Sequence, residues 1–470
     1  MNVILVIFDS LRKDCVGVYG QPPWGKVHTP NIDAFARDCV LFTNVWPESL
    51  PTLPTRRAVY TGNRVYPFHN GDFALKGDFV GAPGWGPIPE EQDTLGEMLQ
   101  AEGYRTALVS DVYHQFKPSK NYWRGFDQWV FLRGQETDPY RSGPRLTQEE
   151  LDYWLPPELR DAGHQMRERF VEQCVMNYYD RKSEEEFFSA RVLRESALWL
   201  EQNRDAEQFF LTVESFDPHE PWLPPAYYRE MYLKEEGPEN IVSVYGDGLA
   251  EHDMLLRRTQ ANYSGEVTMC DRWFGYFLEQ LRVMGLLENT MVVLTSDHGH
   301  SIGDRGFTGK RGYPSHPSVY EIPLMIRFPS AEYAGQVREA MIQHHDITAT
   351  VLDWLGVDPP QAIDGRSFLE VVGDPARAIR EHATVGWGSA VTVIADRWWY
   401  NAKIDGTGAL LHDRISDGDC VENVAARHPE TVRELQSLAE TDAVGGYPDW
   451  LMKLAREQVD APGCSALAAR

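Results

Sequence analysis

The chain has 470 residues, of which 42% are hydrophobic and 12% aromatic, enough to form a large buried core. Its formal net charge of −25 argues against nucleic acid and anionic membranes as partners, because both repel an acidic surface. No apolar run has the length of a membrane span, and six cysteines without a C-x-x-C pair favour a reducing, cytoplasmic location over a disulfide scaffold.

Apolar, β-branched runs alternate with amphipathic segments over most of the chain. The first run, residues 3–8, has no basic segment before it, so we expect no signal peptide. Further strands are predicted at 106–110, 209–214, 291–295 and 322–328, and helices at 94–102, 184–203, 261–284 and 345–352. Alternating strands and helices predict an α/β fold with a large, mostly parallel sheet sandwiched by helices.

The pattern changes after about residue 375. Short strand-like pieces follow one another at 383–387, 390–395, 398–404 and 409–413, with a hairpin tip at 406–408 and a helix at 429–440. They predict a smaller antiparallel sheet. We therefore divide the chain into a catalytic α/β domain, residues 1–375, and a C-terminal α+β subdomain, residues 376–470. A polar, proline-containing stretch at about 133–181 is predicted to be an insertion in the first domain.

Polar side chains follow several of the predicted strands. Asp9 ends the first strand, His219 follows the strand at 209–214, and Asp297 and His298 follow the strand at 291–295. Open α/β sheets place their sites at the carboxyl ends of strands, so we expect these groups to lie together. Two carboxylates and an imidazole are suitable ligands for a divalent cation. Each residue alone is more often a turn or helix-capping residue, and only the combination favours a metal site.

Residues 52–62, TLPTRRAVYTG, predict a helix that begins near Thr52. A threonine there is usually an N-cap, and this is the structural alternative. The functional interpretation is a nucleophile at a helix N-terminus, where the helix dipole also helps to hold an anionic ester. Arg56 lies one turn further and would stabilise the Thr52 alkoxide, whereas Arg57 would face a solvated surface.

A glycine-rich stretch, residues 296–310, follows the strand that ends at Asp297. Glycines at this density are typical of a loop that approaches a ligand closely. Lys310 is a candidate for binding an ester oxygen or assisting the leaving group, with an ordinary surface lysine as the alternative. His316 in the same loop is a candidate substrate-binding residue.

Taken together, these segments resemble the sulfatase family of the alkaline phosphatase superfamily. In that family a Cys or Ser is followed by any residue, Pro, a small residue, Arg, four residues and Thr-Gly, which matches residues 52–62 apart from the first position. Further similar segments are residues 2–14, 29–36, 103–107, 218–222, 296–310, 322–324, 345–356 and 364–365.

The resemblance implies roles for the residues singled out above. Asp9, Thr52, Asp297 and His298 would be ligands of one divalent metal ion. Arg56 would support the nucleophile. His219 and Lys310 would contact the ester and its leaving group, and the substrate would be a small anionic ester.

Three departures from the family pattern change the expected chemistry. Thr52 replaces the residue that is oxidised to formylglycine, and no formylglycine is expected because its carbinol carbon carries a methyl group. Ser10 replaces a second acidic residue, which weakens a calcium site. This departure and the Asp297–His298 pair are more similar to the phosphonate monoester hydrolase and phosphodiesterase branch, and that resemblance implies manganese in preference to zinc, magnesium or calcium. Asp111 and Tyr113 stand near the place of a sulfate-binding lysine and are candidate substrate-binding residues.

The favoured function is hydrolysis of phosphate diesters or phosphonate monoesters, because a threonine ester of phosphate can be released by direct attack of water. Two alternatives stay open: a sulfatase that tolerates threonine, and a non-catalytic member of the family that binds an anion. The sequence also leaves the oligomeric state open, a homo-oligomer included.

Overall fold

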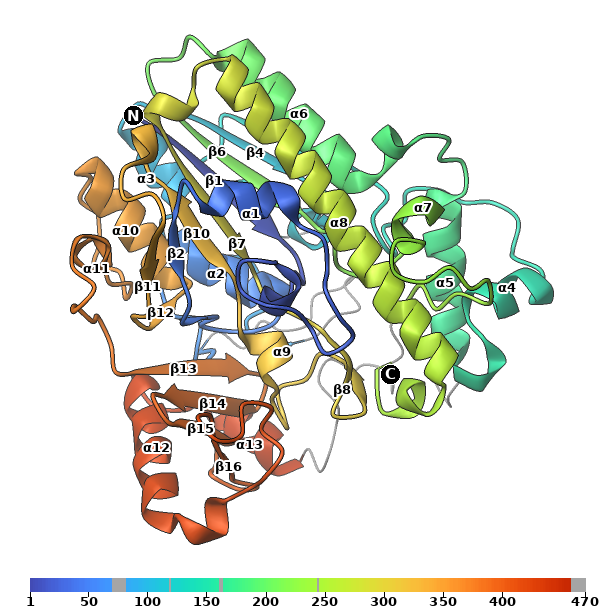
Figure 1. Ribbon diagram of the computed structural model, residues 1–470. Coiled ribbons are helices and arrows are strands. Elements are labelled where there is room, and N and C mark those ends of the chain that lie inside the picture. The colour runs from blue at the N-terminus through green and yellow to red at the C-terminus, as the bar shows by residue number, and fades with distance from the viewer. Residues whose placement is uncertain (70–81, 118–119, 160–163, 243–244, 458–470) are drawn as a thin grey trace.

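The computed structural model describes residues 1–69, 82–117, 120–159, 164–242 and 245–457, and its centre is an eight-stranded sheet (Figure 1). The strand order is β11-β2-β10-β7-β1-β6-β4-β5. The strands are β1 (Asn2–Phe8), β2 (Val40–Phe42), β4 (Arg105–Ser110), β5 (Gln128–Phe131), β6 (Phe209–Ser215), β7 (Thr290–Ser296), β10 (Leu324–Arg327) and β11 (Gln336–Arg338).

Strand β1 lies in the middle of the sheet, between β6 and β7, and pairs in parallel with both. All seven of its residues are buried. Ile4 and Val6 enter the core on one face, and Val3 and Leu5 enter the core on the other. A strand that is buried on both faces needs a continuous apolar sequence, which explains why the run at the start of the chain is not alternating.

Helices cover both faces of this sheet. One face packs against α1 (Pro30–Ala36), α6 (Phe188–Asn203) and α8 (Asp253–Val283), and the other against α2 (Thr52–Thr61), α3 (Leu95–Ala101), α10 (His345–Leu355) and α11 (Leu369–Gly373). In Figure 1, α8 crosses the front of the sheet diagonally with α6 beside it. The predicted α/β class and the predominantly parallel sheet are confirmed.

Some predicted elements differ in their bounds or direction. The strand predicted at 322–328 is β10, which runs antiparallel to β7 and β2. The helix predicted from residue 184 begins at Phe188, after a short 3-10 turn at Glu184–Glu186. The helix predicted from 261 starts earlier, at Asp253.

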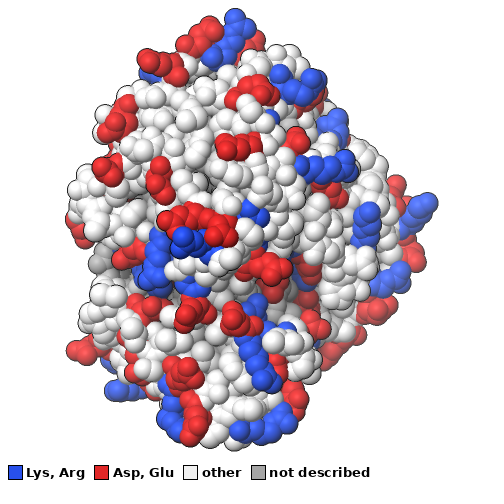
Figure 2. Space-filling model, turned by 60° about the vertical axis from the view of Figure 1, so that its left-hand side comes forward, with Lys and Arg blue, Asp and Glu red and all other residues white. Residues whose placement is uncertain are grey.

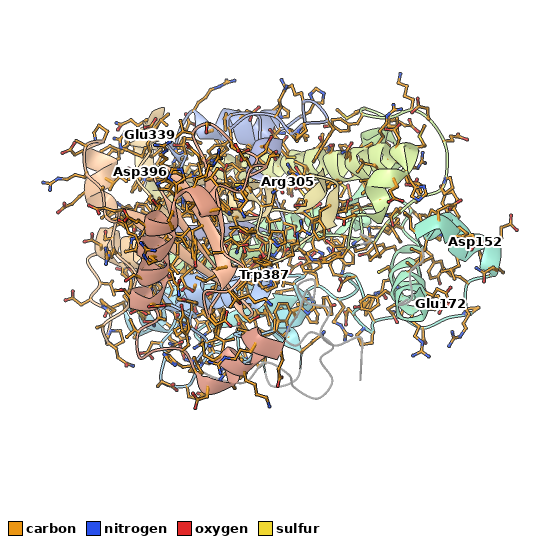
Figure 3. All side chains as sticks on the ribbon, turned by 90° about the horizontal axis from the view of Figure 1, so that it is seen from below. Asp152, Glu172, Arg305, Glu339, Trp387 and Asp396 are labelled. Atoms are coloured by element: carbon orange, nitrogen blue, oxygen red, sulfur yellow. The ribbon has the colours of Figure 1, made fainter. Side chains whose placement is uncertain are left out.

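The polar stretch at 133–181 contains helices α4 (Gln148–Trp154) and α5 (His164–Tyr178), with the short α7 (Ala226–Arg229) nearby in Figure 1. Their apolar side chains form a separate cluster that includes Leu151 and Val171. Figure 3 shows Asp152 and Glu172, on α4 and α5, at the opposite flank of the molecule from Glu339 and Asp396.

The predicted smaller sheet is also confirmed. Its antiparallel strands are β13 (His382–Trp387), β14 (Ala390–Ala395), β15 (Trp398–Lys403) and β16 (Leu410–Asp413), followed by α12 (Pro429–Asp442) and α13 (Asp449–Glu457). An aromatic cluster, Trp46, Tyr320 and Trp399, joins this sheet to the main body, with ring centroids of Trp46 and Trp399 5.7 Å apart. In Figure 1 this smaller sheet lies below the larger one.

Two short pairs are the remaining described strands: β3 (Val45–Trp46) with β12 (Ile342–Gln343), and β8 (Ser301–Asp304) with β9 (Phe307–Gly309). Among the described helices, none is both long and apolar enough to cross a membrane. Cys15, Cys39, Cys174, Cys270 and Cys420 are buried thiols, and Cys464 lies outside the described residues.

Candidate active site

The candidate site lies at the carboxyl edge of four neighbouring strands of the large sheet, which run in parallel in the order β7-β1-β6-β4. Asp297 follows β7, Asp9 follows β1 and Asp111 follows β4, while His219 lies four residues beyond the end of β6. Parallel strands bring their carboxyl ends to one edge, and this topology collects residues that are far apart in the sequence.

Asp9, Asp297 and His298 form the one group of potential metal ligands found among the described residues, with ligand atoms within 4.8 Å of one another. All three side chains are buried. Asp9 Oδ2 and His298 Nε2 have no hydrogen-bond partner in the described structure, and Asp9 Oδ2 makes only an ion pair, with Arg56 Nη1 at 3.0 Å. Buried polar atoms are normally satisfied, so two such atoms beside a second carboxylate fit a divalent cation.

The ionisation of this group also suits a cation. Burial lowers the pKa of His298 to about 4, which keeps the imidazole neutral and able to ligate a metal. Burial opposes the ionisation of Asp297, but the neighbouring His298 and Arg56 lower its pKa. Burial and the adjacent Asp297 raise the pKa of Asp9. Two carboxylates this close repel each other, and a bound cation relieves that repulsion.

Ser10 connects the two carboxylates. Its backbone N–H donates to Asp297 Oδ1 at 2.9 Å, and its hydroxyl donates to Asp9 Oδ1 at 3.0 Å. Ser10 has a φ of 60°, in the left-handed region that non-glycine residues avoid. Such strain persists only where surrounding contacts hold it, and here those contacts fix the orientation of both carboxylates.

Thr52 is the first residue of α2, and its side chain is 3% exposed. The N-cap of this helix is Pro51, and it makes no side-chain capping bond. The structural alternative, in which Thr52 caps the helix, is therefore wrong. Thr52 nevertheless lies at the helix N-terminus, where unpaired backbone N–H groups favour an anion.

Arg56 joins Thr52 to the carboxylates. Its Nη1 donates to the backbone oxygen of Thr52 at 3.1 Å and to Asp297 Oδ2 at 2.7 Å, and it lies 3.0 Å from Asp9 Oδ2. Arg57 was expected on a solvated surface, but this is wrong: it is 7% exposed, and its Nε donates to Gln92 Oε1 at 3.2 Å.

Lys310 and His219 meet on another side of the site. Lys310 Nζ lies 2.6 Å from His219 Nε2 and 3.5 Å from Ser10 Oγ. His219 Nδ1 faces the backbone oxygen of Glu220 at 2.6 Å, so this nitrogen carries the proton and Nε2 accepts from Lys310. Burial, and then the charge of Lys310, lower the pKa of His219 and keep the imidazole neutral.

Glu220 lies behind this pair. Its Oε2 is 3.7 Å from Lys310 Nζ, and its Oε1 accepts from the hydroxyl of Tyr245 at 3.0 Å. The side chain is 4% exposed. Glu220 thus supplies a buried counter-charge for Lys310, so Lys310 is not the surface lysine of the alternative interpretation.

The remaining predicted site residues have other partners. Asp111 accepts from the backbone N–H of Phe216 at 2.6 Å and from Gln135 Nε2 at 3.0 Å. The hydroxyl of Tyr113 donates to Glu136. His316 is the N-cap of α9 (Pro317–Tyr320), and its Nδ1 lies 2.8 Å from Ser318 Oγ. In the structure, the side chains of Asp111, Tyr113 and His316 therefore take part in hydrogen bonds with neighbouring groups of the protein.

Sequence reasoning missed Glu214, which lies within β6 and is 0% exposed. Its Oε2 accepts from Arg56 Nε at 2.9 Å. A charged residue inside the otherwise apolar run FFLTVES was the available signal, because strands in the middle of a sheet seldom contain an unpaired carboxylate.

The face of the molecule that Figure 2 shows offers little attraction to an anionic ligand from a distance. Figure 2 shows acidic and basic side chains interspersed over one face. The buried cations Arg56 and Lys310, together with the candidate metal site, are consequently the groups that would attract a negative charge at close range.

Comparison with known proteins gives consistent matches. The family model named Sulfatase matches residues 1–357. The chain is 27% identical to the multifunctional alkaline phosphatase superfamily protein PehA of Trinickia caryophylli, over 79% of this chain and 77% of that protein. It is 24% identical to an arylsulfatase of Clostridium perfringens, over 81% and 80%. A phosphonate monoester hydrolase from Silicibacter pomeroyi has a similar structure, with a TM-score of 0.71 and 20% identity over 96% of this chain and 97% of that one.

Proposed function

The chain belongs to the sulfatase family, and from that premise we propose that it is a metal-dependent hydrolase of phosphate diesters or phosphonate monoesters with Thr52 as nucleophile. The observation that carries the proposal is Thr52 at the start of α2, beside Arg56 and the cluster of Asp9, Asp297 and His298. A formylglycine hydrate releases sulfate by collapsing to an aldehyde. Threonine has no such route, so an ester that water can cleave at phosphorus suits it better.

In the first step the Thr52 oxygen attacks phosphorus, the Thr52 O–P bond forms and the bond to the leaving alcohol breaks, and the hydroxyl proton of Thr52 passes in net to the departing alcohol. Arg56 is placed to stabilise the developing negative charge, because its Nη1 already donates to the backbone of Thr52. In the second step water attacks phosphorus, the Thr52 O–P bond breaks, and the threonine hydroxyl regains a proton. The products are an alcohol and a phosphate monoester or phosphonate.

Lys310 and His219 serve the leaving group. The Lys310 ammonium donates to neutral His219 and, when a substrate is bound, can give a proton or a hydrogen bond to the departing oxygen. Glu220 supplies the counter-charge that makes a buried ammonium tolerable. In this proposal Arg56 acts on the nucleophile, and Lys310 acts on the leaving group.

A divalent ion fits between Asp9, Asp297 and His298, as their unsatisfied buried atoms indicate. When bound, such an ion would neutralise negative charge on the ester and lower the pKa of a hydroxyl at the site. Neutral His298 and the two carboxylates would hold it, and Ser10 would keep the carboxylates oriented.

The first test compares the hydrolysis of an aryl phosphate diester and the matching aryl sulfate by manganese-loaded protein. We expect the diester to be the better substrate and Thr52→Ala to lose roughly 1,000-fold or more in kcat, as expected for removal of a nucleophile. Thr52→Ser should retain activity. Thr61→Ala, at the other end of the same helix, is the matched control and should keep the wild-type rate.

Two results would contradict the proposal. Diester hydrolysis that is undiminished in Thr52→Ala would exclude Thr52 as nucleophile. Faster hydrolysis of the sulfate than of the diester, dependent on Thr52, would instead establish a sulfatase that works without an aldehyde.

A further inference from the structure

One nitrogen of Arg56 is buried without a partner. Nε donates to Glu214, and Nη1 donates to Thr52 and Asp297. Nη2 has no hydrogen-bond partner in the described structure, although Arg56 is 0% exposed. A buried guanidinium normally satisfies all its donors, and an open one is expensive unless a ligand completes it.

The hydrogen bonds of the Glu214 carboxylate explain why Arg56 Nη2 has no partner. A carboxylate beside an arginine usually binds two of its nitrogens at once, here Nε and Nη2. Glu214 binds only Nε, through Oε2. Its other oxygen, Oε1, accepts from the hydroxyl of Tyr60 at 2.7 Å and from Gln115 Nε2 at 3.2 Å.

Gln115 is fixed in turn. Its Oε1 accepts from the hydroxyl of Ser110 at 2.7 Å, and its Nε2 also lies 3.2 Å from the oxygen of Tyr60. Tyr60, Gln115 and Glu214 are all buried. The carboxylate therefore cannot turn toward Nη2 without breaking its bonds to Tyr60 and Gln115.

We propose that Tyr60, Gln115 and Glu214 are positioning residues that keep Arg56 Nη2 free to donate to a non-bridging oxygen of the substrate's phosphoryl or phosphonyl group. Nη2 adjoins both Nε and Nη1 on the planar guanidinium, so fixing those two nitrogens fixes the direction of the third. Nη1, on the same guanidinium carbon, donates to the backbone oxygen of Thr52 and to Asp297 Oδ2, so the open donor belongs to a group that already contacts the proposed nucleophile residue and a candidate metal ligand. The inference deepens the proposed function and rests on it for the identity of the oxyanion.

The first experiment measures binding of inorganic phosphate to manganese-loaded protein by calorimetry. Tyr60→Phe removes the shorter of the two bonds that hold Glu214 Oε1 and so weakens the restraint that keeps the carboxylate from turning toward Nη2. We expect Tyr60→Phe to weaken phosphate binding about tenfold, and we expect Glu214→Gln to weaken it by a similar factor. Tyr122→Phe is the matched control: this tyrosine is equally buried, its ring centroid is 6.1 Å from that of Tyr60, and its hydroxyl donates to the backbone of Leu53. It should change binding less than about twofold.

The second experiment is a double-mutant cycle on diester hydrolysis. We expect Glu214→Gln to lower kcat about tenfold or more in the natural background while KM changes little, because the lost contact strengthens in the transition state. In an Arg56→Lys background, where no Nη2 exists, the same change should have less than about a twofold effect. Thermal unfolding of each variant verifies that it is folded.

The outcomes separate this inference from the proposed function. Equal phosphate affinity in wild type, Tyr60→Phe and Glu214→Gln, or no phosphate binding by the wild type, would overturn the inference. An equal loss of rate in both backgrounds of the cycle would also overturn it, since it indicates a structural role alone. If the diester is not hydrolysed but phosphate binding still depends on Tyr60 and Glu214, the proposed function fails and the inference stands.

Discussion

At the scale of single residues, the carboxyl group of Asp111 lies at the end of β4, where it is fully buried in a hydrogen-bond network. Gln135 Nε2 bridges it to Asp217, with distances of 3.0 Å to Asp111 and 2.6 Å to Asp217. Burial and then the nearby Asp217 raise the pKa of Asp111 to about 8. The folded protein consequently holds a proton here at pH values where an unfolded chain does not.

This shift predicts how stability depends on pH. A carboxyl whose folded pKa is raised contributes stability fully below its unfolded pKa of 3.8, and loses it as the pH rises toward the folded value of about 8. Between these values the free energy of unfolding should fall by up to about 1.4 kcal/mol per pH unit from this group. Denaturant unfolding at several pH values should therefore show a shallower slope for Asp111→Asn than for wild type.

The control for that measurement is Asp205→Asn, which removes one negative charge from an exposed position. It should follow the wild-type slope. A slope for Asp111→Asn that equals that of wild type would contradict the assignment of the bound proton to Asp111.

Residues at strand ends could be chosen from the sequence because the position of a strand fixes where its last residue lies. Asp9, Asp297 and His298 are found together for that reason, although their roles stay predictions. The partners of Arg56 could not be chosen in this way. Glu214 lies 158 positions from Arg56 in the sequence. Whether it contacts Arg56 depends on the orientation of its side chain within β6, which no local pattern specifies.

At the scale of elements, the β8–β9 hairpin determines where Lys310 lies. Lys310 follows Gly309, the last residue of β9, whose φ is 120°. A Cβ atom at Gly309 would lie 2.7 Å from Cγ of Tyr245, whose hydroxyl holds Glu220. The glycine therefore allows both an unusual backbone conformation and a close approach to the support of Lys310.

Gly309→Ala should displace Lys310 from His219. We expect a loss of about tenfold or more in kcat/KM for the diester, because a shift of about 1 Å in a catalytic group is costly. The matched control is Gly306→Ala in the same hairpin: its φ is 79°, but no atom lies within 4 Å of the added methyl group. Equal losses in the two variants would show that backbone strain alone, and not the contact with Tyr245, is responsible.

Elements with a clear hydrophobic pattern were predictable, and elements without one were not. The strands β1, β4, β6 and β7 follow clear hydrophobic runs and were predicted within a few residues of their bounds, whereas helix α8 begins eight residues before its predicted start at 261. β3 has two residues and β2 has three, too few to show a period. The antiparallel direction of β10 was also beyond a local pattern, because an apolar run does not indicate which way a strand runs.

At the scale of the whole molecule, a bound ion should stabilise the fold as well as the reaction. The candidate ligands come from strands that are distant in sequence, so an unfolded chain offers no comparable site. At a free manganese concentration about 100 times the dissociation constant, the gain would be about 2.7 kcal/mol. Chelation should lower the Tm and abolish diester hydrolysis, and added manganese should restore both.

Asp297→Asn supplies the comparison. With one ligand weakened, its Tm should respond much less to chelator or to added manganese than that of the wild type. A wild-type Tm and rate that chelation leaves unchanged would contradict a metal at this site.

The central position of β1 has a consequence for biosynthesis. Its partners β6 and β7 are encoded far downstream, and 287 positions separate Ser10 from Asp297. At roughly 5–20 residues per second, the ribosome adds Asp297 about 15 to 60 s after Ser10. Strand β1, the most apolar strand of the sheet, lacks both of its neighbours until β6 is made, and it lacks β7 for the whole interval. The nascent chain therefore needs protection from aggregation until translation is well past its midpoint, and pauses before β7 should lower the yield of folded enzyme.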